Sequence, residues 1–212
     1  MPIPPSIRLA RTDDAARIAE LYAPSVTERP TSFELVPPDT AEMAARIDKV
    51  LRHWPWLVWC DRAGVQGYAY ASAYAERICY QWSVTVSVYV ADDLQRGGVG
   101  RALYTRLFEI LRRQGAVNAF AGITLPNEAS VGLHRKMGFE PVGVYPRAGF
   151  KLGAWHDVAW LGLALRVPPP GEVPGPPRAL PALIAEGALP ALVAEGDLTS
   201  PGANGALADR LT

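Results

Sequence analysis

Cysteine, histidine and excess charge are all scarce in this chain of 212 residues. It has two cysteines and three histidines, and its 21 basic side chains balance 21 acidic ones, so the formal net charge is zero. Neither Cys60 nor Cys79 stands near a second cysteine or a histidine at the spacing of metal ligands. This predicts two reduced thiols rather than a disulfide, and no bound metal. The balanced charge gives no basic surface for nucleic acid.

Long hydrophobic runs are missing as well. Apolar residues make up 49% of the chain, but no uninterrupted stretch approaches the ~18 residues that a membrane-spanning helix needs. The first residues, Met1 to Pro5, show neither the basic nor the apolar segment of a secretory signal. We therefore expect a cytoplasmic protein that binds neither a membrane nor nucleic acid.

Proline and aromatic residues divide the chain in two. Residues 167–212 hold nine of the 20 prolines and no aromatic residue, and they contain a nine-residue repeat, Ala179–Gly187 followed by Ala188–Gly196. This composition favours a low-complexity tail, flexible or loosely docked. Each unit is nevertheless long enough for two short helical turns, which leaves docking on the domain or on a partner as an alternative. We expect the chemistry in a domain formed by residues 1–166.

Periodic patterns in residues 1–166 predict a mixed sheet flanked by helices. Residues 83–90 alternate, with valines at every even position and polar or aromatic residues between them. Asp39 and Glu42 have the spacing of a helix capping box, and Gly115 is placed to end a helix. Further strands are expected at 7–10, 56–60, 65–72, 116–125, 141–150 and 155–165, helices after Thr12 and Asp39 and over 100–114 and 130–137, and a loop over 24–38.

A glycine-rich turn, Gln95-Arg-Gly-Gly-Val-Gly-Arg101, joins the alternating strand to the next helix. Glycine lets backbone amides approach an anion, the start of a helix adds unpaired N–H groups, and arginines can pair with phosphates. The turn lacks the Lys-Ser/Thr ending of a Walker loop, and Leu103 replaces the third glycine of a dinucleotide-binding motif. Taken alone, it is equally a plain connection between strand and helix.

Two motifs together resemble the GCN5-related N-acetyltransferase (GNAT) superfamily. The pattern Gln95-x-x-Gly98-x-Gly100 is similar to its acetyl-CoA pyrophosphate loop, and residues 127–139 are similar to its later Asn, short helix and Gly-Phe. The resemblance covers residues 6–165. It implies an α/β (α+β) GNAT fold with a mostly antiparallel central sheet.

Shorter matches resemble a narrower group, the phosphinothricin, arsinothricin and methionine sulfoximine acetyltransferases. They are Tyr80-Gln-Trp82, Val88-Tyr-Val90, Leu103-Tyr104, Leu125-Pro-Asn127 and residues 149–158. The resemblance implies a homodimer that uses acetyl-CoA as cosubstrate. It also implies that the substrate is a small, glutamate-like amino-acid antimetabolite. Acetylation of its α-amino group would inactivate it.

The same resemblance implies how acetyl-CoA is held. Backbone groups of Val88, Tyr89 and Val90 would line the pantetheine, and a free amide among them would polarise the acetyl carbonyl. Asn127 would bind the pantetheine or thiol region, although as a residue before a helix it is equally a plain cap. The residues expected around the pyrophosphate are Gln95, Arg96, Gly97, Gly98, Val99, Gly100 and Arg101.

Three residues are expected to take part in the chemistry: His134, Thr85 and the amide of Tyr89. His134 stands where many relatives have a general-acid tyrosine, and an imidazole can accept or relay a proton. Thr85 stands where this group has a glutamate base, and it cannot take up a proton at neutral pH. Either His134 is the base, directly or through a water that Thr85 orients, or a carboxylate such as Glu34 replaces it, or turnover is slow.

A pocket for an acidic amino acid needs cations and aromatic walls. The resemblance implies that Arg77 clamps a carboxylate and that Lys151 reaches the pocket of a neighbouring subunit. Simpler roles remain open: a solvated Arg77 beside Glu76, aromatic core packing, and a Lys151 on a hairpin turn. The aromatic residues expected in the walls are Phe33, Tyr74, Tyr80 and Trp82.

Two other functions stay open at this point. One is acetylation of another small amine or amino acid; few acidic residues near the expected pocket argue against an aminoglycoside. The other is a catalytically weak acyl-CoA-binding protein, which Thr85 and the repeat tail favour.

Overall fold

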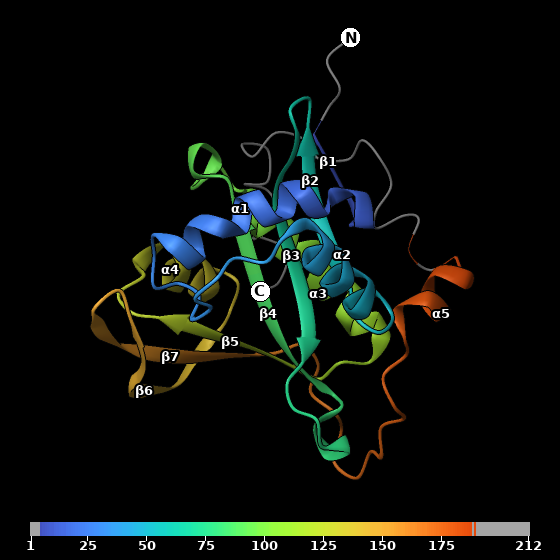
Figure 1. The fold of residues 1–212 in the computed structure, drawn as a ribbon. Coiled ribbons are helices and arrows are strands. Elements are labelled where there is room, and N and C mark those ends of the chain that lie inside the picture. Colours follow the sequence, from blue (N-terminus) through green and yellow to red (C-terminus); the bar gives the residue numbers. More distant parts are fainter. Residues whose placement is uncertain (1–4, 188, 190–212) are drawn as a thin grey trace.

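Seven strands form one sheet in the order β1-β2-β3-β4-β5-β7-β6 in the computed structural model, which describes residues 5–187 and 189 (Figure 1). Every neighbouring pair is antiparallel except β4 and β5. This confirms the mixed, mostly antiparallel sheet. The strands are β1 (Ser6–Leu9), β2 (Trp56–Asp61), β3 (Gly64–Ala73), β4 (Ser83–Val90), β5 (Asn118–Thr124), β6 (Glu140–Lys151) and β7 (Ala154–Ala164).

The helices begin and end largely where their capping residues predict. The carboxylate of Asp39 accepts the N–H of Glu42 at 2.8 Å before α2, and Gly115, with φ +90°, ends α3. The loop predicted from residue 24 is wrong at its start, because α1 continues to Thr27 and Pro24 lies inside its final turns. The α-helices are α1 (Ala15–Thr27), α2 (Thr40–Leu51), α3 (Val99–Gln114), α4 (Glu128–Lys136) and α5 (Leu180–Ala185), and the 3-10 helices are η1 (Thr12–Asp14), η2 (Ile78–Tyr80) and η3 (Asp92–Leu94).

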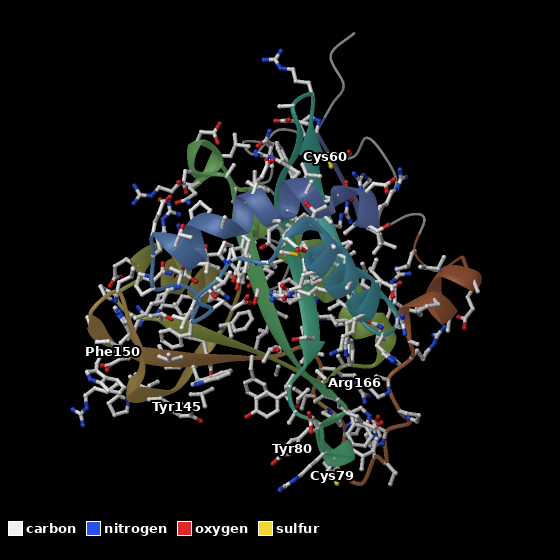
Figure 2. All side chains as sticks on the ribbon, in the orientation of Figure 1. Cys60, Cys79, Tyr80, Tyr145, Phe150 and Arg166 are labelled. Atoms are coloured by element: carbon white, nitrogen blue, oxygen red, sulfur yellow. The ribbon has the colours of Figure 1, made fainter. Side chains whose placement is uncertain are left out.

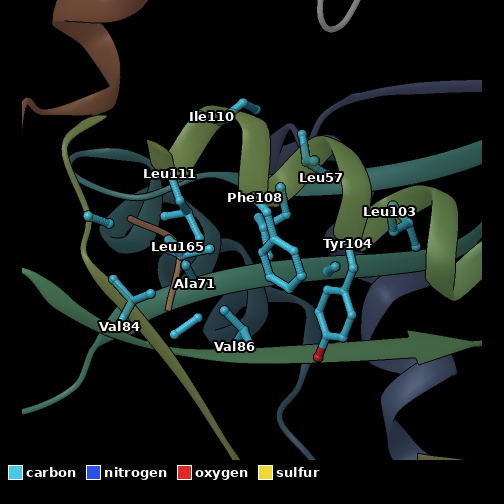
Figure 3. Close-up of a cluster of buried hydrophobic side chains, with 14 of the residues drawn as sticks. Leu57, Ala71, Val84, Val86, Leu103, Tyr104, Phe108, Ile110, Leu111 and Leu165 are labelled. Carbon is cyan, nitrogen blue, oxygen red and sulfur yellow. The ribbon is translucent and has the colours of Figure 1, made fainter. Parts of the chain in front are cut away.

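Helices cover both faces of the sheet, so β4 has two different sides. Val84 and Val86 of β4 join the buried cluster that contains Leu103 and Leu107 of α3, and Figure 3 shows side chains of this cluster between α3 and the sheet. On the other face, α1 and α2 pack over a second cluster, and Tyr89 of β4 packs against it. The alternation of residues 83–90 is confirmed.

The sheet splits between β4 and β5. These strands pair only through Ser83–Thr85 and Asn118–Phe120, after which β4 continues along β3 and β5 continues along β7. Figure 1 shows the two groups of strands diverging from this point. Within the described residues, the second half of β4 therefore has no strand neighbour on its β5 side.

The first repeat unit packs on the domain, the alternative that the sequence left open. Its helix α5 buries Leu180 and Leu183, which join the same cluster as α3. Leu189 of the second unit is buried there too. The other residues of that unit lie outside the described residues. Among the described helices, none has the length and apolar character required to cross a membrane.

Candidate active site

The glycine-rich turn forms an open start to α3. Gly98 precedes the helix with φ +89°, a left-handed conformation that favours glycine. The carbonyl of Gly98 accepts the N–H of Ala102 at 2.9 Å. The three helical residues before Ala102 thus present the N–H groups that a helix start leaves without intrahelical acceptors.

Two positions of this turn have little room for a side chain because neighbouring atoms of the protein lie close to them. A Cβ at residue 97 would lie 3.0 Å from the carbonyl oxygen of Leu94, and one at residue 100 would lie 3.0 Å from Cδ2 of Leu133. Arg96 and Arg101 are both exposed beside the free amides. The structure thus brings the predicted residues 95–101 together in an arrangement that fits the diphosphate of acetyl-CoA.

The splayed half of β4 supplies a second set of unpaired backbone groups. Val88 and Val90 have β3 partners, and because an antiparallel strand points alternate N–H groups to opposite sides, every second one faces the gap toward β5. The ring of Tyr89 stacks on Tyr68 at 5.0 Å and meets Tyr22 edge-on at 5.2 Å. Burial raises the pKa of Tyr89 well above its ordinary value. Only the backbone of Tyr89 is therefore available for the predicted role.

Both nitrogens of His134 are occupied within the chain. Its Nδ1 lies 2.8 Å from the carbonyl oxygen of Ser130, which can only accept, so Nδ1 carries the proton. Nε2 then accepts the hydroxyl proton of Tyr104 at 3.0 Å. His134 is 3% exposed, and burial lowers its pKa. The predicted acid–base residue is a neutral imidazole tied to α3 through Tyr104.

Thr85 forms a hydroxyl pair with the facing strand. Its Oγ1 lies 2.7 Å from Oγ of Ser72, the residue opposite it on β3. Glu34, the alternative base, accepts two N–H groups of Arg46 at 2.8 and 2.9 Å and the hydroxyl of Tyr22 at 2.9 Å. These hydrogen bonds, above all those from Arg46, lower the pKa of Glu34. This environment disfavours Glu34 as the base.

The predicted aromatic walls fall into separate groups. Tyr74 contacts Tyr80 at 5.6 Å and Phe120 of β5 at 4.9 Å, measured between ring centroids. Phe33 instead lies over β6, where a Cβ at Gly149 would be 2.5 Å from its ring. The indole N–H of Trp82 donates to the carbonyl of Gly175 at 2.8 Å, so this residue contacts the tail.

The predicted cation and capping residues also separate. Arg77 is exposed at the start of η2 and, within the described residues, forms no ion pair. Asn127 caps α4, its side chain accepting the N–H of Ser130 at 3.0 Å. In the structure, Asn127 therefore acts as a helix cap, one of the two roles that the sequence left open.

Lys151 is buried and anchors a loop of its own chain. Its ammonium donates to the carbonyls of Ser32 at 2.5 Å, Glu34 at 2.9 Å and Ser25 at 3.4 Å. With 5% exposure, it does not decorate the hairpin turn. In this conformation it does not extend toward a second subunit either.

A cavity of about 530 Å³ lies between α2 and strands β2 and β3. Arg46, Lys49 and Arg52 line it, and its described lining contains no carboxylate. Ser72 belongs to the same lining and links the cavity to Thr85. The remaining lining residues are Tyr22, Met43, Val50, His53, Trp54, Trp56, Tyr68, Tyr70 and Ala73.

Sequence reasoning missed Ser72, Arg46 and Tyr104. The register of the β3–β4 pair would have placed Ser72 opposite Thr85, and Tyr104 stands in a Leu-Tyr motif, but nothing near Arg46 in the sequence points to Glu34. Both cysteines are free thiols. In the part of the chain that the structure describes, no cluster of three His, Cys, Asp or Glu side chains could hold a metal.

Comparison with known proteins shows the family of the chain. A family model for the acetyltransferase (GNAT) domain matches residues 7–160, so the chain belongs to the GNAT acetyltransferase family. A phosphinothricin N-acetyltransferase from Streptomyces viridochromogenes is 34% identical over 175 residues, which are 82% of this chain and 92% of that protein. An L-methionine sulfoximine/L-methionine sulfone acetyltransferase from Pseudomonas paraeruginosa is 37% identical over 162 residues, 76% of this chain and 94% of that one.

A solved structure extends the likeness to three dimensions. The phosphinothricin acetyltransferase from Sinorhizobium meliloti, crystallised with acetyl-CoA, has a TM-score of 0.74 and 34% identity, covering 80% of this chain and 96% of that one. Within the family, this chain is an acetyl-CoA-dependent N-acetyltransferase similar to the phosphinothricin acetyltransferases.

Proposed function

We propose that this enzyme acetylates the α-amino group of a glutamate-like amino-acid antimetabolite, such as phosphinothricin, arsinothricin or methionine sulfoximine, and so gives resistance to it. One observation carries this proposal: the cavity is lined by Lys49, which forms no ion pair within the described residues, by Arg46 and Arg52, which are paired with carboxylates outside the lining, and by Ser72, which is bonded to Thr85. Such a lining suits an acid group at the far end of an amino acid. It does not suit a polycationic aminoglycoside.

Bound acetyl-CoA supplies the acetyl thioester. The free amine of the acceptor forms a bond to the carbonyl carbon and the C–S bond breaks, while the nitrogen releases one proton and the leaving thiolate takes up one proton. Unpaired amides of β4 donate to the carbonyl oxygen, while residues 95–101 hold the diphosphate. Positioning the two reactants in this way lowers the barrier without any ionisable side chain.

Proton transfer falls to two hydroxyl-linked groups. The Ser72–Thr85 pair orients a water that accepts the proton of the acceptor amine. His134 stays neutral, and its Nε2 accepts the hydroxyl proton of Tyr104 on α3, the helix that begins at the glycine-rich turn. Because Nε2 already accepts from Tyr104, a proton reaches His134 only along that hydrogen bond.

Replacing Thr85 by glutamate tests the base position. Thr85→Glu is expected to leave kcat unchanged or to raise it by up to about tenfold, because it adds a carboxylate where the water is held. Thr85→Val is the control, since it removes the hydroxyl while keeping the shape. A folded Thr85→Glu enzyme without activity would show that another proton path occupies this space.

Thiol release from acetyl-CoA, measured with a panel of amines, tests the function itself. The panel contains phosphinothricin, arsinothricin, methionine sulfoximine, glutamate and an aminoglycoside. Saturable turnover with an antimetabolite but not with glutamate supports the proposal. Turnover with another amine, or tight acetyl-CoA binding without turnover, selects one of the two alternative functions.

We further propose a cytoplasmic homodimer that uses the β6–β7 hairpin as its interface. β6 is an edge strand, and an exposed apolar edge invites pairing. Figure 2 shows Tyr145 and Phe150 at this margin. Trp155→Glu should convert the dimer to a monomer in analytical ultracentrifugation. The exposed apolar side chains, 53–63% accessible, are Val142, Val144, Tyr145, Phe150, Leu152 and Trp155.

A further inference from the structure

Residues 166–187 connect two distant parts of the domain, and we call this segment the strap. In Figure 1 it leaves β7, passes the loop that contains η2, and returns to the C-terminal end of α3 as α5. The match to the acetyltransferase family model ends at residue 160, before the strap begins.

One end of the strap is fixed by a buried glutamine. Gln114, 1% exposed, donates from Nε2 to the backbone carbonyls of Arg178 at 2.8 Å and His53 at 2.6 Å, and the backbone carbonyl of Gln114 accepts the N–H of Arg178 at 2.8 Å. The N–H of Leu180 donates to the carbonyl of His53 at 3.2 Å. The side chain of Leu183 is fully buried. This end is anchored by backbone pairing and by apolar burial together.

The middle of the strap lies on Trp82. The carbonyl of Gly175 accepts the indole N–H at 2.8 Å, across 93 positions of sequence. The backbone carbonyl of Trp82 accepts the N–H of Val117 at 2.8 Å, just before β5 begins. Within the strap, Arg166 and Glu172 form an ion pair at 2.7 Å. Trp82 is therefore held between the strap and the point where β4 and β5 meet.

Trp82 ends a loop that has few other supports. Residues 74–82 contain the expected acceptor residues Tyr74, Arg77 and Tyr80, and Figure 2 shows Tyr80 and Cys79 at its outer tip. Ile78 is 71% exposed. Toward the domain, the loop relies on the ring contact of Tyr74 with Phe120 and on the N–H of Tyr74 donating to Ser83. Segments with so little burial open easily.

We propose that the strap positions the acceptor-binding loop, and that Trp82 is the positioning residue through which it acts. The inference rests on the proposed function and on the resemblance described above, which implies that Tyr74, Arg77 and Tyr80 belong to the acceptor pocket. Releasing Trp82 lets the loop sample more conformations, so the acceptor must order it on binding. Acceptor affinity then falls, while the cradle for acetyl-CoA at residues 95–101 is unaffected.

Three single variants of the full chain test the strap. Trp82→Phe removes the indole donor and keeps an aromatic ring. Leu183→Ala loosens α5, and Ile184→Ala is its matched control, because the neighbouring side chain is 47% exposed on the same helix. Hydrogen exchange of peptides covering residues 74–82 is measured together with the acceptor KM, kcat and the Kd of acetyl-CoA.

Trp82→Phe and Leu183→Ala are expected to speed exchange in residues 74–82 about fivefold, and Ile184→Ala to leave it unchanged. The acceptor KM should rise about threefold to tenfold, with kcat and the Kd of acetyl-CoA within about twofold of the starting values. A general loss of packing would move exchange throughout the domain and would not produce this split.

Unchanged exchange in residues 74–82 of Trp82→Phe overturns the proposal. Faster exchange with an unchanged KM overturns its functional part, since the loop would then be loosened without consequence for the acceptor. If no acceptor is turned over at all, the proposed function fails on its own. The exchange measurement still decides whether the strap holds the loop.

Discussion

The two sides of the active site are built on different length scales. The proposed cofactor side consists of seven consecutive residues, 95–101, and the neighbouring end of β4. The proposed acceptor side is assembled by contacts across the chain: Lys151 reaches Ser32 and Glu34 over more than a hundred positions, and Trp82 reaches Gly175. One side is a local backbone shape, and the other is a network of distant side chains.

This difference explains how each side responds to change. A backbone cradle depends on conformations that few residues adopt, so single glycine positions control it. A side-chain network is supported by loops that are individually weak, so its anchors control stability as well as binding. Variants on the cofactor side should therefore mainly change ligand affinity, whereas variants on the acceptor side should also change the stability of the fold.

Where the cofactor side meets α4, His134 gives the largest expected effect. His134→Asn keeps a donor near Ser130 but removes the imidazole, and kcat should fall about a hundredfold, a usual size for lost acid–base help. Single-turnover rates with saturating acetyl-CoA measure it. Tyr104→Phe is the companion variant, because it leaves the imidazole and removes the hydroxyl. Unchanged kinetics in His134→Asn would remove this residue from the mechanism.

On the acceptor side, Lys151→Met should lower the free energy of unfolding by about 2–3 kcal/mol, because buried carbonyls lose a charged donor. Urea unfolding measures this change. Lys49→Met is the control, since within the described residues Lys49 forms no ion pair. Equal stability of the two variants would show that the loop does not depend on its anchor.

Two glycines at opposite ends of α3 sharpen the comparison further. Gly98 and Gly115 have φ of +89° and +90°, so alanine strains both, by about 1 kcal/mol. Only Gly98→Ala should weaken acetyl-CoA binding, about tenfold by calorimetry, because only that residue lies in the anion cradle. Equal loss of affinity in both variants would mean that the helix as a whole, and not the turn, controls binding.

The smallest effect is a pH dependence of stability from His134. Burial lowers the folded pKa below the ordinary value of 6.5, so between those two values the unfolded chain binds the extra proton. The free energy of unfolding therefore rises with pH across this window and falls as the pH drops below 6.5. We expect the free energy of unfolding to be lower at pH 5 than at pH 7.

Thermal unfolding at both pH values measures this loss. His134→Asn should flatten the dependence, whereas His53→Gln, which changes an exposed histidine, should keep it. The lowered pKa values of Asp14 and Glu34 change stability only below about pH 4.5, so they do not contribute to the difference between pH 7 and pH 5. A dependence that survives in His134→Asn would place its origin elsewhere.

The sequence predicts what neighbouring residues determine. The alternation of residues 83–90, the cap at Asp39 and the turn before α3 depend on local geometry, and each appears in the structure where it was expected. The loop predicted to begin at Pro24 was wrong at its start, because a proline near the end of a helix removes only one backbone hydrogen bond. The burial of Lys151, the pairing of Glu34 with Arg46 and the contact of Trp82 with Gly175 need the whole fold, because no local pattern records which distant carbonyl or charge will be the partner.

The splay of the sheet has a consequence for how the molecule opens. Three residue pairs are all that join β4 to β5, so the hydrogen-bonded ladder is close to two separate ladders, β1–β4 and β5–β7. Cooperative opening follows contiguous ladders. The seven strands should therefore exchange their amide protons as two blocks with different protection, divided between β4 and β5.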